Sequence, residues 1–314
     1  MKIINIAGAR PNFMKVAPII EAMNRYPAEI DHLLVHTGQH YDEKMSKSFF
    51  EDLGIPKPDI NLGVGSGSHA EQTAKIMVAF EKVCVKECPD LVIVVGDVNS
   101  TMACTITAKK LGIRVAHVEA GLRSRDMAMP EEINRLCTDV LCDYLFTTDV
   151  LADRNLIQEG VPEEKIHFVG NVMIDTLLFN LEHAVPATTT LANSAVSLSG
   201  GSDYGLVTLH RPSNVDDRDT LVAILDELID VSRRMPLVFP IHPRTMSRIE
   251  EFGLKSVFDG ADGIIQMPPL GYLEFLSLTS NAKVIVTDSG GLQEESSVLG
   301  VPCLTMRENT ERPI

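Results

Sequence analysis

Acidic side chains follow two apolar runs that are typical of buried β-strands. Asp97 comes just after the run 91–95 (LVIVV), and Glu119 directly follows the run 114–118 (RVAHV). In open α/β sheets, ligands bind outside the carboxyl ends of the strands. Other apolar runs also end in polar residues, so a row of polar groups is expected along one sheet edge. The spacing therefore predicts an active site at that edge.

A third acid, Glu131, lies in the segment 129–135 (MPEEINR), which has the features of a helix start. Proline suits the first helical position, acids suit the first turn, and Glu131 could pair with Arg135 four residues later. A role in starting the helix is therefore enough to explain why these residues are present. If Glu131 lies within reach of Asp97 and Glu119, the three carboxylates would also titrate as one coupled group.

Groups suited to binding an anion follow the first strand and a late one. Arg10 and Lys15 come after the run 3–7, and arginine suits bidentate recognition of phosphate. The segment 287–295 (TDSGGLQEE) combines a strand end, a glycine pair and a helix start, where backbone N–H groups and the helix dipole favour an anion. Ser289 could equally be an ordinary helix cap.

His210 and His242 follow later apolar runs, where each could carry a proton or donate a hydrogen bond to phosphate. Either could also simply satisfy neighbouring backbone groups. The nine histidines show no metal-binding spacing, and the six cysteines lack C-x-x-C pairs, so no metal site is expected. The glycine-rich run 63–68 does not follow the first strand, which argues against a nicotinamide cofactor.

Composition narrows the class of protein. The chain has 314 residues, 45% of them hydrophobic, and a formal net charge of −15. Such a charge repels nucleic acid and anionic membranes alike, so neither is an expected partner. No apolar run approaches the ~18 residues of a membrane span, no signal peptide is apparent, and the cysteines fall in apolar patterns typical of reduced core thiols. We expect a cytoplasmic protein.

Apolar runs alternate with helical patterns along the chain, as in doubly wound parallel sheets. We expect two Rossmann-like domains, 1–175 and 176–314, with a linker-like stretch from 183 to 205 that is rich in Ala, Thr, Ser and Gly. Because the sequence ends soon after the last apolar run, the second domain is expected to be small or to lack a C-terminal piece. Strands are predicted over 3–7, 31–36, 91–95, 114–118, 144–147, 166–169, 204–209, 237–241, 263–266, 283–287 and 302–306, and helices over 14–26, 69–86 and 130–142.

Several motifs in order along the whole chain resemble the non-hydrolysing UDP-N-acetylglucosamine 2-epimerases. The resemblance implies a glycosyltransferase-B-like α/β fold, with two Rossmann-like domains facing across a cleft, and a homodimer in polysaccharide precursor synthesis. The motifs are Arg10, Pro11 and Lys15, together with the segments 37–40 (TGQH), 96–97 (GD), 117–124 (HVEAGLRS), 129–135 (MPEEINR), 288–291 (DSGG) and 310–313 (TERP).

The resemblance also implies a reaction, the interconversion of UDP-N-acetylglucosamine and UDP-N-acetylmannosamine. C2 of the sugar has no adjacent carbonyl, so its proton becomes acidic only as UDP leaves C1. The family mechanism is elimination of UDP to 2-acetamidoglucal, followed by re-addition with a proton delivered to the opposite face. No redox cofactor is implied.

Carried onto this sequence, the family pattern assigns three sets of roles. Asp97, Glu119 and Glu131 would be the acid/base carboxylates, assisted by Lys15 and His210. The diphosphate would be held by Arg10, Ser289, Gly290 and Gly291, and the ribose hydroxyls by Glu295. The remaining substrate-binding residues would be Gln39, His40, Arg123, Arg135, His242 and Arg312, the three arginines orienting the acids or the phosphates.

Other functions fit the same motifs. The nearest alternative is a UDP-2,3-diacetamido-glucuronate 2-epimerase; others are a hydrolysing epimerase that releases N-acetylmannosamine, a glycosyltransferase of the same fold, and a silent nucleotide-sugar-binding protein. The run 41–43 (YDE) departs from the polar residues of allosterically regulated bacterial members, which argues against allosteric activation.

Overall fold

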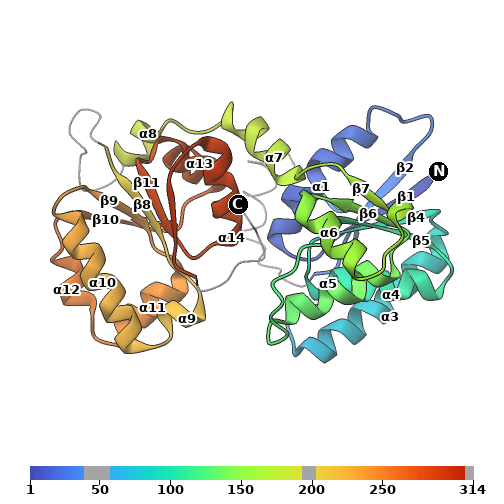
Figure 1. Ribbon diagram of the computed structural model, residues 1–314, viewed down its shortest axis with the longest axis horizontal. Coiled ribbons are helices and arrows are strands. Elements are labelled where there is room, and N and C mark those ends of the chain that lie inside the picture. Colours follow the sequence, from blue (N-terminus) through green and yellow to red (C-terminus); the bar gives the residue numbers. More distant parts are fainter. Residues whose placement is uncertain (39–56, 193–202, 308–314) are drawn as a thin grey trace. The chain divides into compact units, whose positions relative to one another are not determined.

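The computed structural model describes residues 1–38, 57–192 and 203–307, and divides the chain into two compact units. The first unit runs from Met1 to Thr176, and the second begins at Leu177. Each unit is built on an open, entirely parallel β-sheet with helices on both faces (Figure 1). The predicted α/β class with two Rossmann-like, doubly wound sheets is confirmed.

The first unit contains a seven-stranded sheet in the order β3-β2-β1-β4-β5-β6-β7. The order reverses next to β1, where doubly wound folds bind their ligands. Its strands are β1 (Lys2–Ala7), β2 (Asp31–His36), β3 (Ile60–Asn61), β4 (Leu91–Val95), β5 (Arg114–Ala120), β6 (Tyr144–Thr147) and β7 (Ile166–Phe168). Its helices are α1 (Arg10–Met23), α3 (His69–Glu87), α4 (Asn99–Lys110), α5 (Pro130–Leu141), α6 (Val150–Gln158), the 3-10 turn Glu163–Lys165, and the start of α7 (Val172–Leu181).

The second unit contains a five-stranded sheet in the order β10-β9-β8-β11-β12, which repeats the same winding. Its strands are β8 (Gly205–Thr208), β9 (Leu237–Pro240), β10 (Ile264–Met267), β11 (Val284–Thr287) and β12 (Cys303–Thr305). Its helices are the end of α7, α8 (Ala187–Ala192), α9 (Pro212–Val215), α10 (Arg218–Ser232), α11 (Pro243–Glu251), α12 (Lys255–Asp259), α13 (Tyr272–Asn281) and α14 (Gly290–Leu299).

The strands are apolar because both faces of each sheet are covered. In the second unit, α9 to α12 lie over one face, and α8, α13 and α14 over the other (Figure 1). Phe239 on β9 packs edge-on against Phe258 of α12 in the first of these layers, and Ile285 on β11 belongs to the opposite one. Polar residues therefore lie mainly at the ends of the strands rather than on the covered faces of the sheet.

Local signals explain where several helices begin. Ser68 accepts a hydrogen bond from the Glu71 N–H while the Glu71 carboxylate accepts one from the Ser68 N–H, a capping box that starts α3. Asp149 caps α6 in a similar way through the N–H groups of Leu151 and Ala152. Both start signals are readable in the sequence.

Three expectations about elements need correction. The first helix begins at Arg10, four residues before the predicted start, because Pro11 occupies its first turn. The stretch 183–205 is not all linker, since α8 (Ala187–Ala192) buries Thr190 and Leu191. The strand predicted over 114–118 continues to Ala120.

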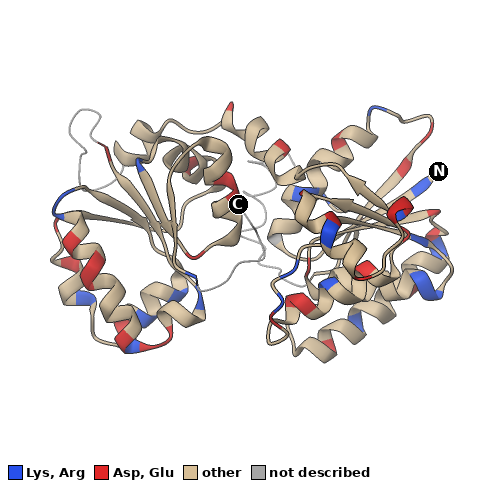
Figure 2. Ribbon diagram, in the orientation of Figure 1, with Lys and Arg blue, Asp and Glu red and all other residues tan. Residues whose placement is uncertain are grey.

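Charged residues lie mainly on helices and loops, while the strands carry few (Figure 2). The helices α10 and α11 show this most clearly, since both carry acidic and basic residues. Within the described part of the chain, no helix is both long and apolar enough to cross a membrane.

Candidate active site

The carboxyl ends of β4 and β5 present the two acids that the sequence singled out. β4 ends at Val95 and leads through Gly96 to Asp97, while Glu119 lies within β5. The pairing of β5 with β6 shifts register between Val118 and Ala120, and Glu119 has a left-handed φ of 74°. Such a bulge redirects a side chain at a sheet edge. Glu119 therefore adopts a strained backbone conformation in the bulge that sets the direction of its side chain.

Glu119 forms an ion pair with Lys15 of α1. Both side chains are almost completely buried, with 4% and 7% of their surface exposed. A buried charge needs a partner of opposite sign, so each residue makes the burial of the other tolerable. The structure thus brings together two of the five residues predicted to be catalytic.

Asn12, which the sequence analysis did not single out, shapes the loop between β1 and α1. Its Oδ1 accepts hydrogen bonds from the N–H groups of Gly8 and Ala9, and its Nδ2 donates to the Val95 carbonyl at 3.2 Å. One buried side chain thereby links the ends of β1 and β4. The signal was available, since an asparagine after a strand-end proline is suited to capping.

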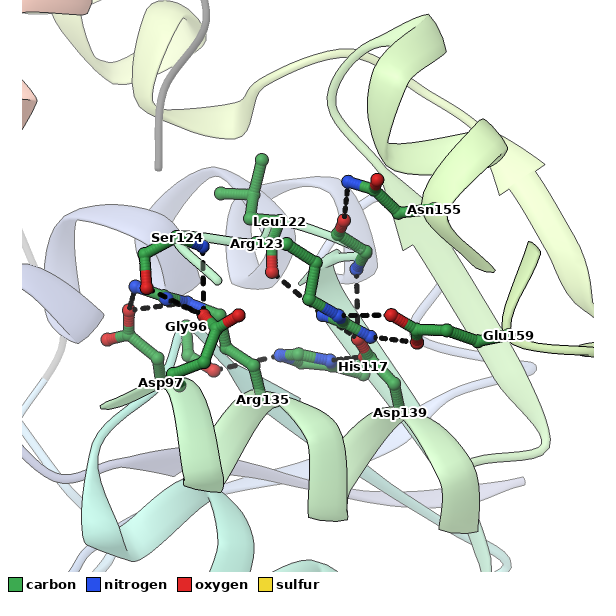
Figure 3. A network of polar contacts seen from close by, with 12 residues as sticks. Gly96, Asp97, His117, Leu122, Arg123, Ser124, Arg135, Asp139, Asn155 and Glu159 are labelled. Carbon is green, nitrogen blue, oxygen red and sulfur yellow. Dashed lines mark hydrogen bonds and ion pairs between the residues drawn. The ribbon is translucent and has the colours of Figure 1, made fainter. Parts of the chain in front are cut away.

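Asp97 is held by Arg135 of α5. Its Oδ2 accepts from the arginine Nε at 3.1 Å and from Nη2 at 2.6 Å (Figure 3). Its backbone carbonyl accepts from Asn134 Nδ2 at 2.8 Å. Both guanidinium bonds end on Oδ2, and 29% of the Asp97 side chain is exposed. Neither guanidinium bond uses Oδ1, so this oxygen is a candidate to take a substrate proton.

The expected pairing of Glu131 with Arg135 is wrong, since Arg135 binds Glu132 at 2.7 Å as well as Asp97. Glu132 also accepts bonds from the N–H groups of Ser124 and Arg125. Burial acts to raise the Glu132 pKa, but these donors together lower it. The Glu131 carboxylate forms no hydrogen bond or ion pair with the described residues. Of the two glutamates, Glu132 is structural, and Glu131 stays a candidate acid in the first turn of α5.

Arg123 does not orient the candidate acids among the described residues. Its guanidinium binds Asp139 at 2.8 Å and both carboxylate oxygens of Glu159, at 2.8 and 2.6 Å (Figure 3). Burial opposes its charge, yet these bonds raise its pKa overall. Only 3% of the Arg123 side chain is exposed. These contacts favour a role for Arg123 in fixing the loop after β5 rather than in binding phosphate.

In the second unit, Asp288 joins the ends of β11 and β8. Oδ2 of this buried carboxylate accepts hydrogen bonds from the N–H groups of His210 and Arg211, each at 2.8 Å, and from Asn214 Nδ2 at 3.1 Å. Its Oδ1 lies 2.7 Å from His210 Nδ1. Burial alone would raise the Asp288 pKa, but the His210 and backbone hydrogen bonds lower it to about 2. The His210 ring is therefore oriented by an ionised acid, with 41% of its side chain exposed.

His242 lies beside His210, with ring centroids 5.5 Å apart. It caps α11, its Nδ1 accepting a hydrogen bond from the Arg244 N–H at 3.2 Å. Because Nδ1 accepts, the proton of a neutral ring sits on Nε2. Burial and then the neighbouring His210 lower the His242 pKa. The structure therefore brings the two predicted histidines together in one cluster.

The predicted phosphate loop starts α14, with Ser289 in the cap position and Gly290 and Gly291 in the first turn. The Ser289 hydroxyl makes no capping bond, so the ordinary-cap explanation is not supported. A β-carbon at Gly291 would meet nothing within 4 Å. The space beside Gly291 and the N–H groups at this helix start are compatible with an anion site.

Glu295 lies on the same helix, one turn further along, and is 7% exposed. Burial raises its pKa to about 7. Tyr272 is near enough for Glu295 to help raise the tyrosine pKa, which burial raises first, and the Tyr272 hydroxyl is buried without a hydrogen-bond partner among the described residues. Both groups could bind hydroxyls of a ligand.

Some predicted site residues lie outside what the structure describes. These are Gln39, His40 and Arg312, together with the side chain of Arg10. Their roles stay predictions.

One family model and several named relatives match the chain over most of its length. The family model for UDP-N-acetylglucosamine 2-epimerase matches residues 21–314. A Methanocaldococcus jannaschii protein named UDP-N-acetylglucosamine 2-epimerase is 48% identical over 100% of this chain and 85% of its own length. A Pseudomonas aeruginosa protein named UDP-2,3-diacetamido-2,3-dideoxy-D-glucuronate 2-epimerase is 42% identical over 99% of this chain and 84% of its own.

Solved structures agree with the sequence relatives. The M. jannaschii UDP-GlcNAc 2-epimerase in complex with UDP-GlcNAc and UDP superposes with a TM-score of 0.87 at 47% identity, covering 100% of this chain and 86% of that one. The Neisseria meningitidis UDP-GlcNAc 2-epimerase bound to UDP-GlcNAc gives 0.88 at 30% identity, covering 100% and 84%. The chain described here therefore belongs to the UDP-N-acetylglucosamine 2-epimerase family of isomerases.

Proposed function

We propose that this chain interconverts UDP-N-acetylglucosamine and UDP-N-acetylmannosamine by inverting C2. The observation that carries the proposal is the 48% identity over the full chain to an M. jannaschii protein named for this activity. The geometry of the first unit supports it, because Asp97 follows β4, Glu119 lies near the end of the neighbouring β5, and each is held by a buried cation.

The proposed chemistry proceeds in two balanced halves. In the first, the C1–O bond to the diphosphate breaks, the C2 proton passes to the enzyme, and the C2–H electron pair forms the C1=C2 double bond of 2-acetamidoglucal. In the second, a diphosphate oxygen of UDP attacks C1, and a proton is delivered to C2 from the opposite face. The sugar is neither oxidised nor reduced overall, so the proposed reaction needs no redox cofactor.

The roles follow from what each group can do. Proton transfer on two faces of C2 requires more than one acid or base, for which we assign Asp97, Glu119 and Glu131, with Lys15 and His210 assisting. Negative charge develops on the leaving diphosphate. For that charge we assign Arg10 and the Ser289, Gly290 and Gly291 start of α14, and we assign the ribose hydroxyls to Glu295.

Hydrogen exchange at C2 tests the mechanism. Incubation with UDP-N-acetylglucosamine in deuterated water should place deuterium at C2 of both sugars, as read by NMR. Asp97→Asn keeps an acceptor for Arg135 but cannot take a proton, and should slow exchange by about 100-fold or more. Asp226→Asn, at an exposed carboxylate on α10, is the matched control. Epimerisation without deuterium at C2 would contradict the mechanism.

A second substrate is supported by the 42% identical relative named UDP-2,3-diacetamido-2,3-dideoxy-D-glucuronate 2-epimerase. Assaying both nucleotide sugars under the same conditions decides between them by kcat/KM. Free N-acetylmannosamine among the products would indicate a hydrolysing enzyme. Binding of UDP without C2 exchange would indicate a silent binding protein.

We also propose that the enzyme is a homodimer. The support on this chain is an apolar hollow between α3, α4 and α5 of the first unit, lined by Met77, Met102 and Ile133 among others. Further apolar side chains on α3 and α5 are exposed, including Val78, Val85 and Val140. A second copy that covered them would remove this apolar surface from water.

A further inference from the structure

A buried histidine that the proposed mechanism does not use lies beneath the candidate acids. His117 is in the middle of β5 and is 0% exposed. Its Nδ1 lies 2.6 Å from Oδ1 of Asp139 on α5, and its Nε2 lies 2.8 Å from the carbonyl oxygen of Gly96 (Figure 3). The ring thus connects a helix to the turn that leads into Asp97.

Both partners of the ring can only accept hydrogen bonds. A carbonyl has no proton, and the other oxygen of Asp139 already receives the Gly121 N–H at 3.1 Å and the Arg123 guanidinium at 2.8 Å. Asp139 is therefore held as a carboxylate. A neutral imidazole has one N–H and could satisfy only one of the two acceptors, whereas an imidazolium satisfies both.

The charges around the ring are compatible with a buried cation. Asp139 faces His117 directly from α5, and Arg123 and Glu159 continue the network behind Asp139. On the Gly96 side lie the ion pair of Lys15 with Glu119 and that of Asp97 with Arg135. The thiol of Cys142, the residue after α5, interacts electrostatically with Asp139. Burial would raise the Asp139 pKa, but His117 and Arg123 lower it overall.

The Gly96 peptide is fixed from both sides by β5. Its N–H donates to the Val118 carbonyl at 3.1 Å, while its own carbonyl accepts from His117. Its φ is +65°, and a β-carbon there would lie 3.0 Å from Lys15 Nζ and 3.4 Å from Glu119 Oε2. The His117 bond therefore holds a left-handed turn that lies between the two candidate acids.

We propose that His117 is a doubly protonated positioning residue, which ties Asp139 to the Gly96 carbonyl and so fixes the turn that aims Asp97. Its positive charge also favours the ionised state of the nearby acids. The part of this inference that concerns catalysis rests on the proposed epimerase function. The charge state of the ring does not.

Nitrogen-15 NMR of the histidine rings tests the charge state without any assay of activity. In the folded full chain at neutral pH, both His117 nitrogens should give signals of protonated ring nitrogens. Asp139→Asn keeps the shape of the helix side chain but removes the counter-charge, and should leave one His117 nitrogen unprotonated. An unprotonated ring nitrogen on His117 in the unsubstituted protein would overturn the proposal.

Kinetics of His117→Gln test the positioning role. The amide can still donate to Gly96 but carries no charge, so kcat for C2 exchange should fall by about 10-fold to 100-fold with KM little changed. The acidic limb of the pH profile should move to higher pH, because the acids lose a neighbouring cation. His167→Gln, at an exposed histidine on β7, is the matched control.

The outcomes separate this proposal from the proposed function. A His117→Gln protein that melts at lower temperature but keeps the wild-type kcat and pH profile would show a merely structural histidine and overturn the positioning role. An unsubstituted protein with no exchange on any nucleotide sugar, whose His117 nevertheless carries both protons, would overturn the proposed function and support the charge state.

Discussion

At the scale of single residues, the candidate site of the first unit contains ion pairs whose side chains differ in their exposure to water. Lys15 and Glu119 are almost completely buried, whereas Asp97 keeps 29% of its side chain exposed opposite a buried Arg135. The two acids therefore differ in their exposure to water, although their neighbouring strands bring them to one edge of the sheet.

Breaking the ion pair between Lys15 and Glu119 is predicted to lower the stability of the protein. Lys15→Met leaves a buried carboxylate without its cation, so the free energy of unfolding should fall by about 3–5 kcal/mol. Adding Glu119→Gln to Lys15→Met should restore part of this loss, because the buried charge that Lys15 opposed is gone. Denaturant unfolding of both single variants and the double variant measures the coupling. Losses that simply add would show that the two charges do not interact.

Burial of Glu295 predicts that the stability of the protein depends on pH. Its pKa is about 7 in the folded protein, against an ordinary 4.5, because of burial. Between these values the folded state keeps a proton that the unfolded state has released, so stability falls as pH rises through this window. Relative to the unsubstituted protein, Glu295→Gln should gain about 3 kcal/mol in free energy of unfolding from pH ~4.5 to pH ~8.

Urea unfolding at several pH values measures this difference. Glu227→Gln, at an exposed glutamate on α10, is the control and should show no such trend. If the Glu295→Gln and unsubstituted proteins respond to pH in parallel, Glu295 is not protonated in the folded state.

At the scale of elements, strand ends and the turns after them position the chemistry. Gly96 after β4 and Glu119 in the β5 bulge both adopt left-handed φ values, of 65° and 74°. An L side chain rarely adopts this conformation, so its presence at Glu119 indicates that the surrounding contacts impose it. The first unit therefore stores strain where the candidate acids lie.

Alanine substitutions at Gly112 and Gly96 distinguish the effect of backbone strain from the effect of steric crowding at the candidate site. Gly112→Ala introduces strain at a φ of +75° with nothing within 4 Å of the new β-carbon, and should lower the free energy of unfolding by about 1–2 kcal/mol without affecting activity. Gly96→Ala adds a contact at 3.0 Å with Lys15 Nζ, and should lower both stability and kcat further. Thermal unfolding and C2 exchange rates measure the two effects. Equal behaviour of the variants would mean that crowding at Gly96 does not matter.

At the scale of the whole molecule, each unit carries its own sheet, its own core and its own set of candidate groups. The carboxylates Asp97, Glu119 and Glu131 belong to the first unit, and the histidine cluster and the start of α14 to the second. With a net charge of −15, the protein as a whole repels the dianionic diphosphate that it is proposed to bind. Local cations and helix N-termini must therefore supply the attraction.

Oligomeric state is a whole-molecule prediction. Light scattering coupled to size-exclusion chromatography should give twice the 34.4 kDa mass of one chain. Ile133→Asp places a charge in the apolar hollow of α3, α4 and α5, and should yield a folded monomer. Val298→Asp, at an exposed position on α14, should leave the dimer intact. A monomeric unsubstituted protein, or a dimer that survives Ile133→Asp, would contradict the proposed surface.

Strand positions and the family were readable from the sequence. Runs such as 91–95 are unbroken and β-branched because parallel strands are buried on both faces, and the predicted bounds of β2, β4 and β6 match the structure. The helix start at Pro130 carries a proline in the first turn followed by two acids, and the start at His69 carries a capping box, so both starts were predictable. These features depend on neighbours in the chain, which a sequence displays directly.

The partners of the charged side chains were decided only by the tertiary structure. Helix spacing predicted that Arg135 pairs with Glu131, yet it binds Asp97, which lies 38 positions earlier, and Glu132. His117 and Asp139, 22 positions apart, meet because β5 and α5 pack together. A buried charge takes whichever opposite charge the packing brings within reach, and the packing of distant segments is not visible in local sequence patterns.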